Sequence, residues 1–311
     1  MTAPLVLMDS ASLYFRSFYA LPESMTAPDG TPVNAVRGFT DTVARILLDR
    51  GPSRLVACLD ADWRPEFRVA ALPSYKAHRV AEGGAEELVP DTLTPQVPII
   101  LDVLDAAGIA TAEATGYEAD DVIGALAAAE TADPVEVVTG DRDLFQVVRD
   151  TPTPAVVVYV GRGWAKAEVI GPRELAEKYA LPAEYAGVAY ADMAVLRGDP
   201  SDGLPGVAGI GEKTAAKLIT EFGSLEALVA AVYDGRDRRL SARVRTKMTE
   251  AAGYLAAAPT VVRVATDAPV VLDRADAVPA APADEARLLD LKRQWGLGTS
   301  VDRLIAALRR N

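Results

Sequence analysis

The sequence is poor in residues that carry thiol and imidazole chemistry, with one cysteine and one histidine among 311 residues. A zinc site built from cysteine and histidine is excluded because its ligands are missing. A single cysteine also excludes an internal disulfide. The lone histidine, His78, lies in a basic stretch with no nucleophile signal near it, which argues against a Ser-His triad. The chemistry is therefore expected to depend on carboxylates, lysines, arginines and metal ions.

Long apolar runs are missing as well, because no stretch approaches ~18 uninterrupted apolar residues and no membrane span is expected. The N-terminus lacks the basic flank and apolar core of a signal peptide. With 50% hydrophobic and 24% charged residues, the composition is that of a globular protein with one large or two modest domains. The single cysteine favours a reducing cytoplasm. A net charge of −12 argues against nucleic acid as a partner. This argument is weak, because phosphate is bound by local basic patches and not by the net charge of the whole chain.

What the sequence does contain is nine carboxylates in five short clusters: Asp9, Asp60, Glu118, Asp120, Asp121, Asp141, Asp143, Asp199 and Asp202. Three clusters follow apolar runs typical of β-strands, and the carboxyl ends of parallel strands open onto one crevice. So many anions share a crevice only where cations neutralise them, and Mg²⁺ or Mn²⁺ are the natural occupants. Aspartates that merely cap turns and helices are the ordinary alternative. Capping alone explains any single aspartate well, but it explains the five clusters together less well.

Apolar periodicity predicts alternating strands and helices in the first half of the chain. Strands are predicted at residues 4–8, 54–59, 135–139 and 155–160, and helices at 11–20, 34–49, 95–107, 118–130 and 142–149. This alternation predicts a parallel sheet covered by helices on both faces. Residues 80–98 interrupt it with two glycines, three prolines and four acids, which is typical of a functional lid or a disordered loop.

After residue 160 the pattern changes to helices with short glycine and proline connections, which places a domain boundary near residue 171. Helices are predicted at 172–179, 185–196, 212–221 and 224–232, followed by a basic stretch at 236–247. Residues 260–283 are expected to pair as strands or to form an ordered tail, and residues 284–309 to form a final helical segment.

A basic segment, FRVAALPSYKAHR at residues 67–79, precedes the interrupted region. It contains Arg68, Tyr75, Lys76 and Arg79. Two interpretations remain open from the residues alone. The segment is either a solvated helix face or a helix that binds phosphate, with Tyr75 as a ring on which a base stacks.

Residues 204–219 read LPGVAGIGEKTAAKLI and resemble two phosphate-binding loops without matching either. Glu212 separates Gly211 from Lys213, and no strand precedes the loop as a P-loop or a dinucleotide-binding turn requires. Two helices joined by a glycine hairpin fit better. Glycines let the backbone approach a phosphodiester, and the next helix supplies free N–H groups. Such a hairpin binds DNA through its backbone without reading bases; a connection without any ligand is the alternative.

In order and spacing, the clusters around Asp9 and Asp60 with FRVAALPSYKAHR, EADD, TGDRDLFQ and GDPSDGLPGVAGIGEKTA resemble the structure-specific 5′-nuclease family. That family includes the 5′→3′ exonuclease domain of bacterial DNA polymerase I, phage 5′-nucleases and flap endonucleases. The resemblance spans roughly residues 4–260 and points to a stand-alone bacterial 5′→3′ exonuclease, since no polymerase domain follows residue 311. It implies an α/β, resolvase-like (PIN-like) nuclease domain at 1–170, with a flexible arch near 76–98. A mostly helical helix-three-turn-helix DNA-binding domain with a C-terminal segment is implied at 171–311.

The resemblance also implies roles for individual residues. A first metal site would be lined by Asp9, Asp60, Glu118 and Asp120, and a second by Asp141, Asp143 and Asp202, with Asp121 and Asp199 bound directly or through water. Lys76 and Arg79 would be the catalytic basic residues, with Arg68 and Tyr75 binding DNA beside them. The remaining DNA-binding residues would be Gly206, Gly209, Gly211, Lys213, Thr214 and Lys217, and backbone carbonyls of this hairpin would hold K⁺.

The implied function is that of a structure-specific 5′→3′ exonuclease and flap endonuclease. It would hydrolyse phosphodiester bonds at or near 5′ ends of DNA by two-metal catalysis, with Mg²⁺ or Mn²⁺, in replication and repair. Its substrates would be 5′ flaps, nicks, recessed 5′ ends and RNA–DNA primers, and it would act as a monomer in the cytoplasm, at the nucleoid. Two alternatives remain: a metal-dependent ribonuclease, against which the hairpin argues, and a non-catalytic DNA junction-binding protein, against which anions facing DNA argue.

Overall fold

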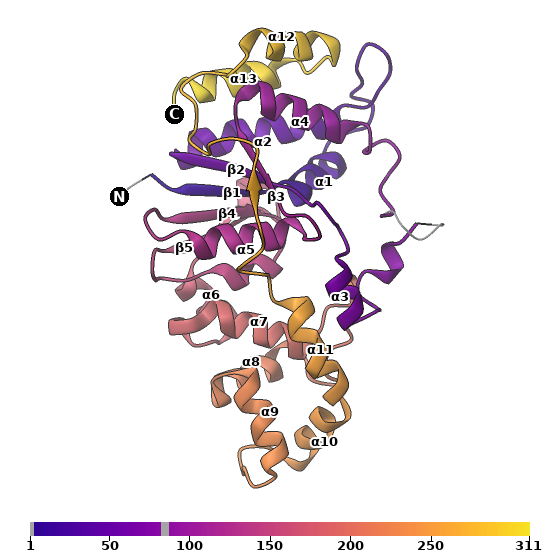
Figure 1. Cartoon of the computed structure of the whole chain (residues 1–311), viewed down its shortest axis with the longest axis vertical. Coiled ribbons are helices and arrows are strands. Elements are labelled where there is room, and N and C mark those ends of the chain that lie inside the picture. Colours follow the sequence, from indigo (N-terminus) through magenta and orange to yellow (C-terminus); the bar gives the residue numbers. More distant parts are fainter. Residues whose placement is uncertain (1–2, 82–86) are drawn as a thin grey trace.

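The computed structural model describes residues 3–81 and 87–311 and is built around a seven-stranded sheet in the order β6-β5-β4-β1-β2-β3-β7 (Figure 1). The five central strands are β1 (Leu5–Asp9), β2 (Arg54–Cys58), β3 (Ala110–Glu113), β4 (Val135–Thr139) and β5 (Ala155–Tyr159), and they are parallel. The edge strands β6 (Glu168–Ile170) and β7 (Val271–Leu272) are antiparallel. The expected parallel sheet is therefore correct at the centre and wrong at both edges.

Strand β1 shows why this sheet needs helices on both faces. Leu5 and Leu7 belong to one hydrophobic cluster, and Val6 and Met8 belong to another on the opposite face. Successive side chains of a strand point to opposite faces of the sheet. Because β1 has no polar residue before Asp9, both of its faces must be covered by other elements. One cover includes α5 (Ala119–Ala129), and the other includes α2 (Asn34–Arg50) and α4 (Gln96–Ala107).

The departures from the predicted elements in the first half have local causes. The strands β3 and β6 are short and lack a long β-branched run, so they give little periodic signal. The helix expected at 142–149 is a short 3₁₀ helix, η2 (Asp143–Val147). Its turn is tightened because the Phe145 N–H donates to the Arg142 carbonyl at 2.9 Å, and the Asp143 N–H donates to the Asp141 carboxylate at 2.9 Å. A short helix, α3 (Glu66–Ala71), lies in the basic segment.

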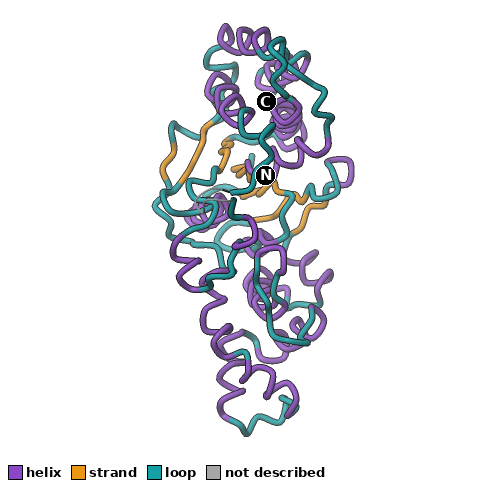
Figure 2. The backbone as a smooth tube through the Cα atoms, turned by 90° about the vertical axis from the view of Figure 1, so that its right-hand side faces the viewer, coloured by secondary structure: helices purple, strands orange, loops and turns teal. Residues whose placement is uncertain are grey.

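The second half of the chain begins as a helical module on one side of the sheet, as Figures 1 and 2 show. Its helices are α6 (Pro172–Tyr179), α7 (Ala186–Arg197), α8 (Glu212–Phe222), α9 (Leu225–Asp234), α10 (Ala242–Glu250) and α11 (Ala252–Val262). The sequence predicts no helix for the basic stretch at 236–247, which overlaps α10, or for the residues of α11. Among the helices of the described residues, none is long and apolar enough to cross a lipid bilayer.

The end of the chain returns to the opposite side of the sheet (Figure 1). After α11 the backbone passes the sheet edge as β7 and pairs with β3. The expected final helical segment is two helices, α12 (Glu285–Gln294) and α13 (Thr299–Leu308), which pack with α4 and α2. The residues assigned by sequence to the second domain therefore include a part that completes the helical cover of the first.

The predicted arch near 76–98 includes residues 82–86, which lie outside the described residues. On either side of them, Val80 and Glu87 form an antiparallel bridge. The segment then ends at Gln96, where α4 begins. The buried Gln96 side chain accepts the Ala35 N–H at 2.8 Å and so fixes the start of α4 against α2.

Candidate active site and DNA-binding hairpin

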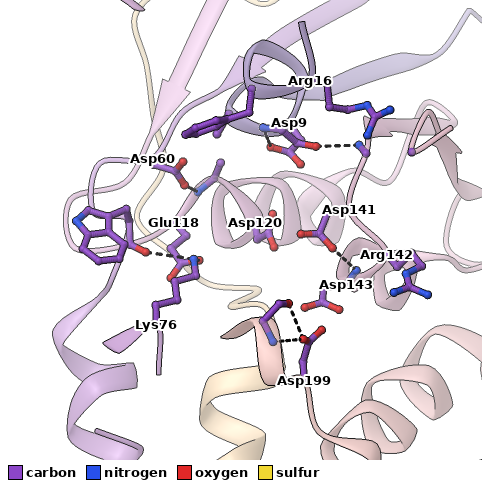
Figure 3. Close-up of a pocket in the computed structure, with 18 of the residues that line it drawn as sticks. Asp9, Arg16, Asp60, Lys76, Glu118, Asp120, Asp141, Arg142, Asp143 and Asp199 are labelled. Carbon is purple, nitrogen blue, oxygen red and sulfur yellow. Dashed lines mark hydrogen bonds and ion pairs between the residues drawn. The ribbon is translucent and has the colours of Figure 1, made fainter. Parts of the chain in front are cut away.

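Seven of the nine carboxylates line one cavity of about 490 Å³, and Figure 3 shows them around it: Asp9, Asp60, Glu118, Asp120, Asp141, Asp143 and Asp199. The topology explains why they meet. Asp9 ends β1, while Asp60 and Asp141 follow β2 and β4, the two strands that flank β1 in the sheet. Asp120 lies on the first turn of α5. The crevice predicted from the strand ends is therefore present in the structure.

Hydrogen bonds fix two of these carboxylates, Asp9 and Asp60, in place. Asp9 accepts from the Thr139 hydroxyl at 2.6 Å and from the Ser12 N–H at 3.1 Å. Asp60 accepts the Ala119 N–H at 2.7 Å, at the start of α5. A carboxylate has about four acceptor positions, so each keeps capacity for a further partner in the cavity.

The crowding of negative charge makes these groups hard to ionise. Desolvation, with the charges of Asp141 and Asp60, raises the pKa of Asp9 to about 7. Desolvation and the charges of Asp141 and Asp202 raise the pKa of Asp143 to about 8. The pKa of Asp120 is also raised, by desolvation and then by Asp9 and Asp141. A cluster in which several pKa values rise together is one that cations would stabilise.

The donor set fits hard divalent cations. The cavity presents carboxylate oxygens and no thiol or imidazole among its lining residues, which is the ligand chemistry of Mg²⁺ and Mn²⁺. Within residues 3–81 and 87–311, however, no three Asp, Glu, His or Cys side chains converge closely enough to hold an ion in this conformation.

Asp121 is not part of the cavity, which corrects its assignment as a metal ligand. Its side chain is 0% exposed and forms a paired contact with Arg68, whose two terminal nitrogens lie 2.7 Å from the two Asp121 oxygens. Arg68 is 2% exposed and also donates to the Val261 carbonyl of α11 at 3.0 Å. In this structure Arg68 is therefore held inside the protein by Asp121 and Val261, which argues against a direct contact with DNA.

Tyr75 is also inside the protein. Its side chain is 3% exposed, and its ring packs against Leu204 and Val261. The phenol O–H donates to Glu118 at 2.7 Å. A ring buried in this way offers little surface to a base, which argues against the predicted stacking role in this conformation.

Lys76 and Arg79, in contrast, do line the cavity. The Lys76 Nζ lies 2.8 Å from the Glu118 carboxylate and 3.2 Å from the Trp63 carbonyl. Arg79 donates to Asp202 at 2.6 Å. Lys76 has a left-handed backbone (φ 47°), and its N–H donates to the Asp202 carbonyl at 3.0 Å. The turn that carries Asp202 thus holds both cations at the place where the two halves of the chain meet.

The cavity also contains residues that the sequence reasoning missed, among them Arg16, Arg142 and Trp63. Arg16 follows Asp9 by seven residues and Ser12 by four, so helical spacing would have placed it on the same face of α1 (Ser10–Ala20). Arg142 stands between two of the clustered aspartates. Trp63 lies in a loop, where no periodic pattern indicates the direction of a side chain.

The glycines of the hairpin (residues 206–211) have different structural roles. Gly206 has φ +66°, and a Cβ there would collide with the Arg197 carbonyl. Gly209 has φ +69°, and a Cβ there would meet the Lys247 side chain. Gly211 has an ordinary φ of −90° and nothing within 4 Å of a built Cβ. Gly206 is thus required by the turn itself, whereas Gly211 leaves open space beside the backbone.

The helix after the hairpin, α8, begins in solvent. Gly211 caps it without a side-chain hydrogen bond, which leaves its first N–H groups free for a ligand. Lys213, Thr214 and Lys217 are exposed along its first turns. The predicted K⁺ ion fits the hairpin poorly, because the Gly209 carbonyl already accepts a cation, the Lys247 ammonium group, at 2.9 Å. A second cation there would be repelled by the first.

Comparison with known proteins gives matches over most of the chain. Residues 4–180 match the model of the 5′-3′ exonuclease N-terminal resolvase-like domain, and residues 186–285 match that of the 5′-3′ exonuclease C-terminal SAM fold. The chain is 56% identical over 314 residues to a 5′-3′ exonuclease of Mycobacterium tuberculosis, covering 99% of this chain and 98% of that one. It is also 43% identical over 228 residues to DNA polymerase I of the same organism, covering 72% of this chain but 24% of the polymerase.

Solved structures share the fold at low sequence identity. A complex of the bacteriophage T5 flap endonuclease with DNA and metal ions has a TM-score of 0.64 at 15% identity and covers 99% of this chain and 98% of its own. The catalytic core of Rad2 with a DNA substrate has a TM-score of 0.59 at 16% identity, with 98% and 92% covered. The arrangement of the sheet and the helical module is therefore one that known proteins share.

Proposed function

The chain belongs to the 5′-3′ exonuclease family, and from this premise we propose that it is a divalent-metal-dependent, structure-specific nuclease that removes 5′ flaps and shortens recessed or nicked 5′ ends of DNA. The observation that carries the proposal is the cavity in which seven of the nine clustered carboxylates lie beside Lys76 and Arg79. A protein that only binds DNA gains nothing from so many anions facing a polyanion, because they repel each phosphate.

We assign the metal-binding role to the seven clustered carboxylates that line the cavity, and we add Asp202 from the adjoining pocket: Asp9, Asp60, Glu118, Asp120, Asp141, Asp143, Asp199 and Asp202. A bound pair of divalent cations supplies Lewis-acid stabilisation and lowers the pKa of water. In the proposed reaction a water oxygen forms a bond to phosphorus while the bond from phosphorus to the 3′ oxygen breaks. The products are a 5′-phosphate and a 3′-hydroxyl.

The basic residues of the cavity have a role that their contacts define. Lys76 and Arg79 are held by Glu118 and Asp202, so their positive charges are already in place when a phosphate arrives. Charge that develops on the phosphate oxygens in the transition state is stabilised best by such preorganised groups. We therefore assign Lys76 and Arg79 to the scissile phosphate, and Arg68 only to the support of the site through Asp121.

The hairpin and α8 supply the duplex-binding surface in this proposal. Free N–H groups at Glu212 and Lys213, with the exposed side chains of Thr214 and Lys217, would contact backbone phosphates. The DNA complexes of the T5 endonuclease and of Rad2, which have this fold, support DNA as the ligand. We extend the proposal to RNA–DNA primers as substrates, to a monomeric protein and to action at the nucleoid in the cytoplasm.

The experiment that tests the proposal uses one labelled duplex with a 5′ flap, incubated with Mg²⁺, with Mn²⁺ and with excess EDTA. We expect cleavage at the flap junction with either ion and none with EDTA, since the carboxylates have no other means to act on a phosphodiester. Full cleavage in EDTA would contradict a metal-dependent mechanism. Binding without cleavage under all conditions would favour a junction-binding protein, and cleavage of RNA alone would favour a ribonuclease.

Two glycines of the hairpin provide a matched test of duplex binding. Gly211→Val is expected to leave thermal unfolding close to that of the wild type, because its side chain enters open space, and to weaken flap-duplex affinity by about tenfold through obstruction of an approaching phosphate. Gly206→Val is expected to lower the melting temperature itself, because of its clash with Arg197. Thermal melts and fluorescence anisotropy distinguish the two effects. Wild-type affinity in a folded Gly211→Val protein would remove the hairpin from the binding surface.

A further inference from the structure

Lys247, on α10, is bound to the hairpin although it is distant from it in sequence. Its Nζ donates to the Gly209 carbonyl at 2.9 Å. The contact is close, because a Cβ added at Gly209 would collide with the same nitrogen. The ammonium group therefore occupies the space that the missing Gly209 side chain leaves.

The neighbouring cations on α10 show that this contact is specific to Lys247. Arg245 donates to the Ala231 carbonyl at 2.7 Å and to the Asp237 carbonyl at 2.9 Å, so it holds the end of α9. Arg243 is exposed to solvent. Of the three basic residues on this helix, Lys247 alone is recorded on the hairpin within the described residues.

The Lys247 ammonium group has hydrogen-bond donors that the Gly209 carbonyl does not use. It carries three N–H donors and no acceptor, and the Gly209 carbonyl takes one of them. Lys247 is half-buried and its contact with the Gly209 carbonyl is exposed, so the remaining donors are open to solvent at the hairpin that leads into α8. They are free to meet a phosphate that approaches the free N–H groups of Glu212 and Lys213.

We propose that Lys247 is the built-in cation of the hairpin, and that its ammonium group takes the place of a free K⁺ ion and contacts a backbone phosphate of the duplex. This inference rests on the proposed function, since it presumes that the hairpin binds duplex DNA. The ammonium orients the Gly209 carbonyl and brings one positive charge to the phosphate surface. A duplex-binding surface with its own cation does not require potassium.

The test compares binding of the full-length protein to a short blunt DNA duplex in EDTA, by fluorescence anisotropy, in matched series of KCl and LiCl. Wild-type affinity is expected to be equal in the two salts at equal ionic strength. In LiCl, Lys247→Met is expected to weaken binding by about tenfold and to reduce the slope of log K against log salt by about 0.9, the value for one phosphate contact. KCl is expected to restore part of this loss, because the vacated carbonyl becomes available to a free cation.

Arg243→Ala is the matched control, because it removes the same charge from the same helix without touching the hairpin. Any loss of affinity in this variant is expected to be equal in KCl and LiCl. Thermal melts verify folding, and Lys247→Arg, which retains the charge, is expected to bind more tightly than Lys247→Met. A potassium requirement in the wild type, or a Lys247→Met variant that behaves like Arg243→Ala, would overturn the proposal. Failure of the wild type to bind any duplex would contradict the proposed function itself.

Discussion

Asp120→Asn is expected to lower the rate of flap cleavage by at least ~10³-fold, at the upper end of the loss seen when one group of a preorganised electrostatic site is removed. The amide is close to the carboxylate in shape but is a poorer ligand for a hard cation. In Figure 3 no hydrogen bond joins Asp120 to the other residues drawn, so the substitution breaks none of those contacts. The rate is measured in a single turnover with excess enzyme and saturating Mg²⁺, and duplex affinity is expected to be retained.

The same variant is expected to be more stable than the wild type when metal is absent. Because the pKa of Asp120 is raised in the folded state by desolvation and by Asp9 and Asp141, the folded protein binds more protons than the unfolded chain above the ordinary pKa of 3.8. Stability then falls as pH rises from about 4 toward the folded-state pKa. The gain in melting temperature from Asp120→Asn, measured in EDTA, should therefore be larger at pH 8 than at pH 5.

Asp121→Asn, one residue along the helix, is the matched control and is expected to have the opposite effect. It leaves the Arg68 guanidinium buried without its full carboxylate partner, and loss of one member of a buried ion pair costs about 3–5 kcal/mol. Urea unfolding should show this loss, together with weakened anchoring of the segment that follows α11, whose Ala265 N–H donates to Asp121 at 2.8 Å. An equal loss of activity in the two variants, with both still stable, would contradict the separation of their roles.

This pair of residues also shows how far the sequence could define the site. The strand ends predicted that Asp9, Asp60 and Asp141 would share a crevice, because the position of a strand end depends on local periodicity and on a general rule of topology. The side chains of Asp120 and Asp121 point about 100° apart on a helix of 3.6 residues per turn. Which one faces the cavity depends on Arg68, a partner 53 positions away, and no local pattern reveals such a partner.

The same limit explains the other errors. The basic segment suggested a surface that binds nucleic acid, but Tyr75 and Arg68 are covered by Val261 from α11, a contact across more than half of the chain. The return of α12 and α13 to the first half of the chain depends on packing with α2 and α4. Their amphipathic sequences predict that each helix is covered on one side, but they do not identify the helix against which it packs. In the hairpin, glycine spacing predicted the turn, but the contact of Lys247 with Gly209 depends on the placement of α10.

Lys76→Ala is expected to lower the single-turnover rate by about 10²–10³-fold, with a much smaller change in DNA affinity, because its charge is placed for the transition state and not for ground-state binding. The ammonium group is fixed 2.8 Å from Glu118 and 3.2 Å from the Trp63 carbonyl. The side chain is therefore already held at the cavity wall and does not have to change its rotamer. Rates and dissociation constants are measured separately, over a series of enzyme concentrations on one flap duplex.

The control for Lys76 lies two residues away in the same segment. His78 is exposed and does not line the cavity, so His78→Ala is expected to keep the wild-type rate. Burial raises the pKa of the Glu118 carboxyl, and removal of Lys76 takes away the main opposing charge that limits this upward shift. When the pH is raised into the alkaline range, the cleavage rate of Lys76→Ala should therefore increase by a larger factor than the rate of the wild type. A normal rate combined with weakened affinity would make Lys76 a phosphate anchor, and the chemical step would then depend on the carboxylates and Arg79 alone.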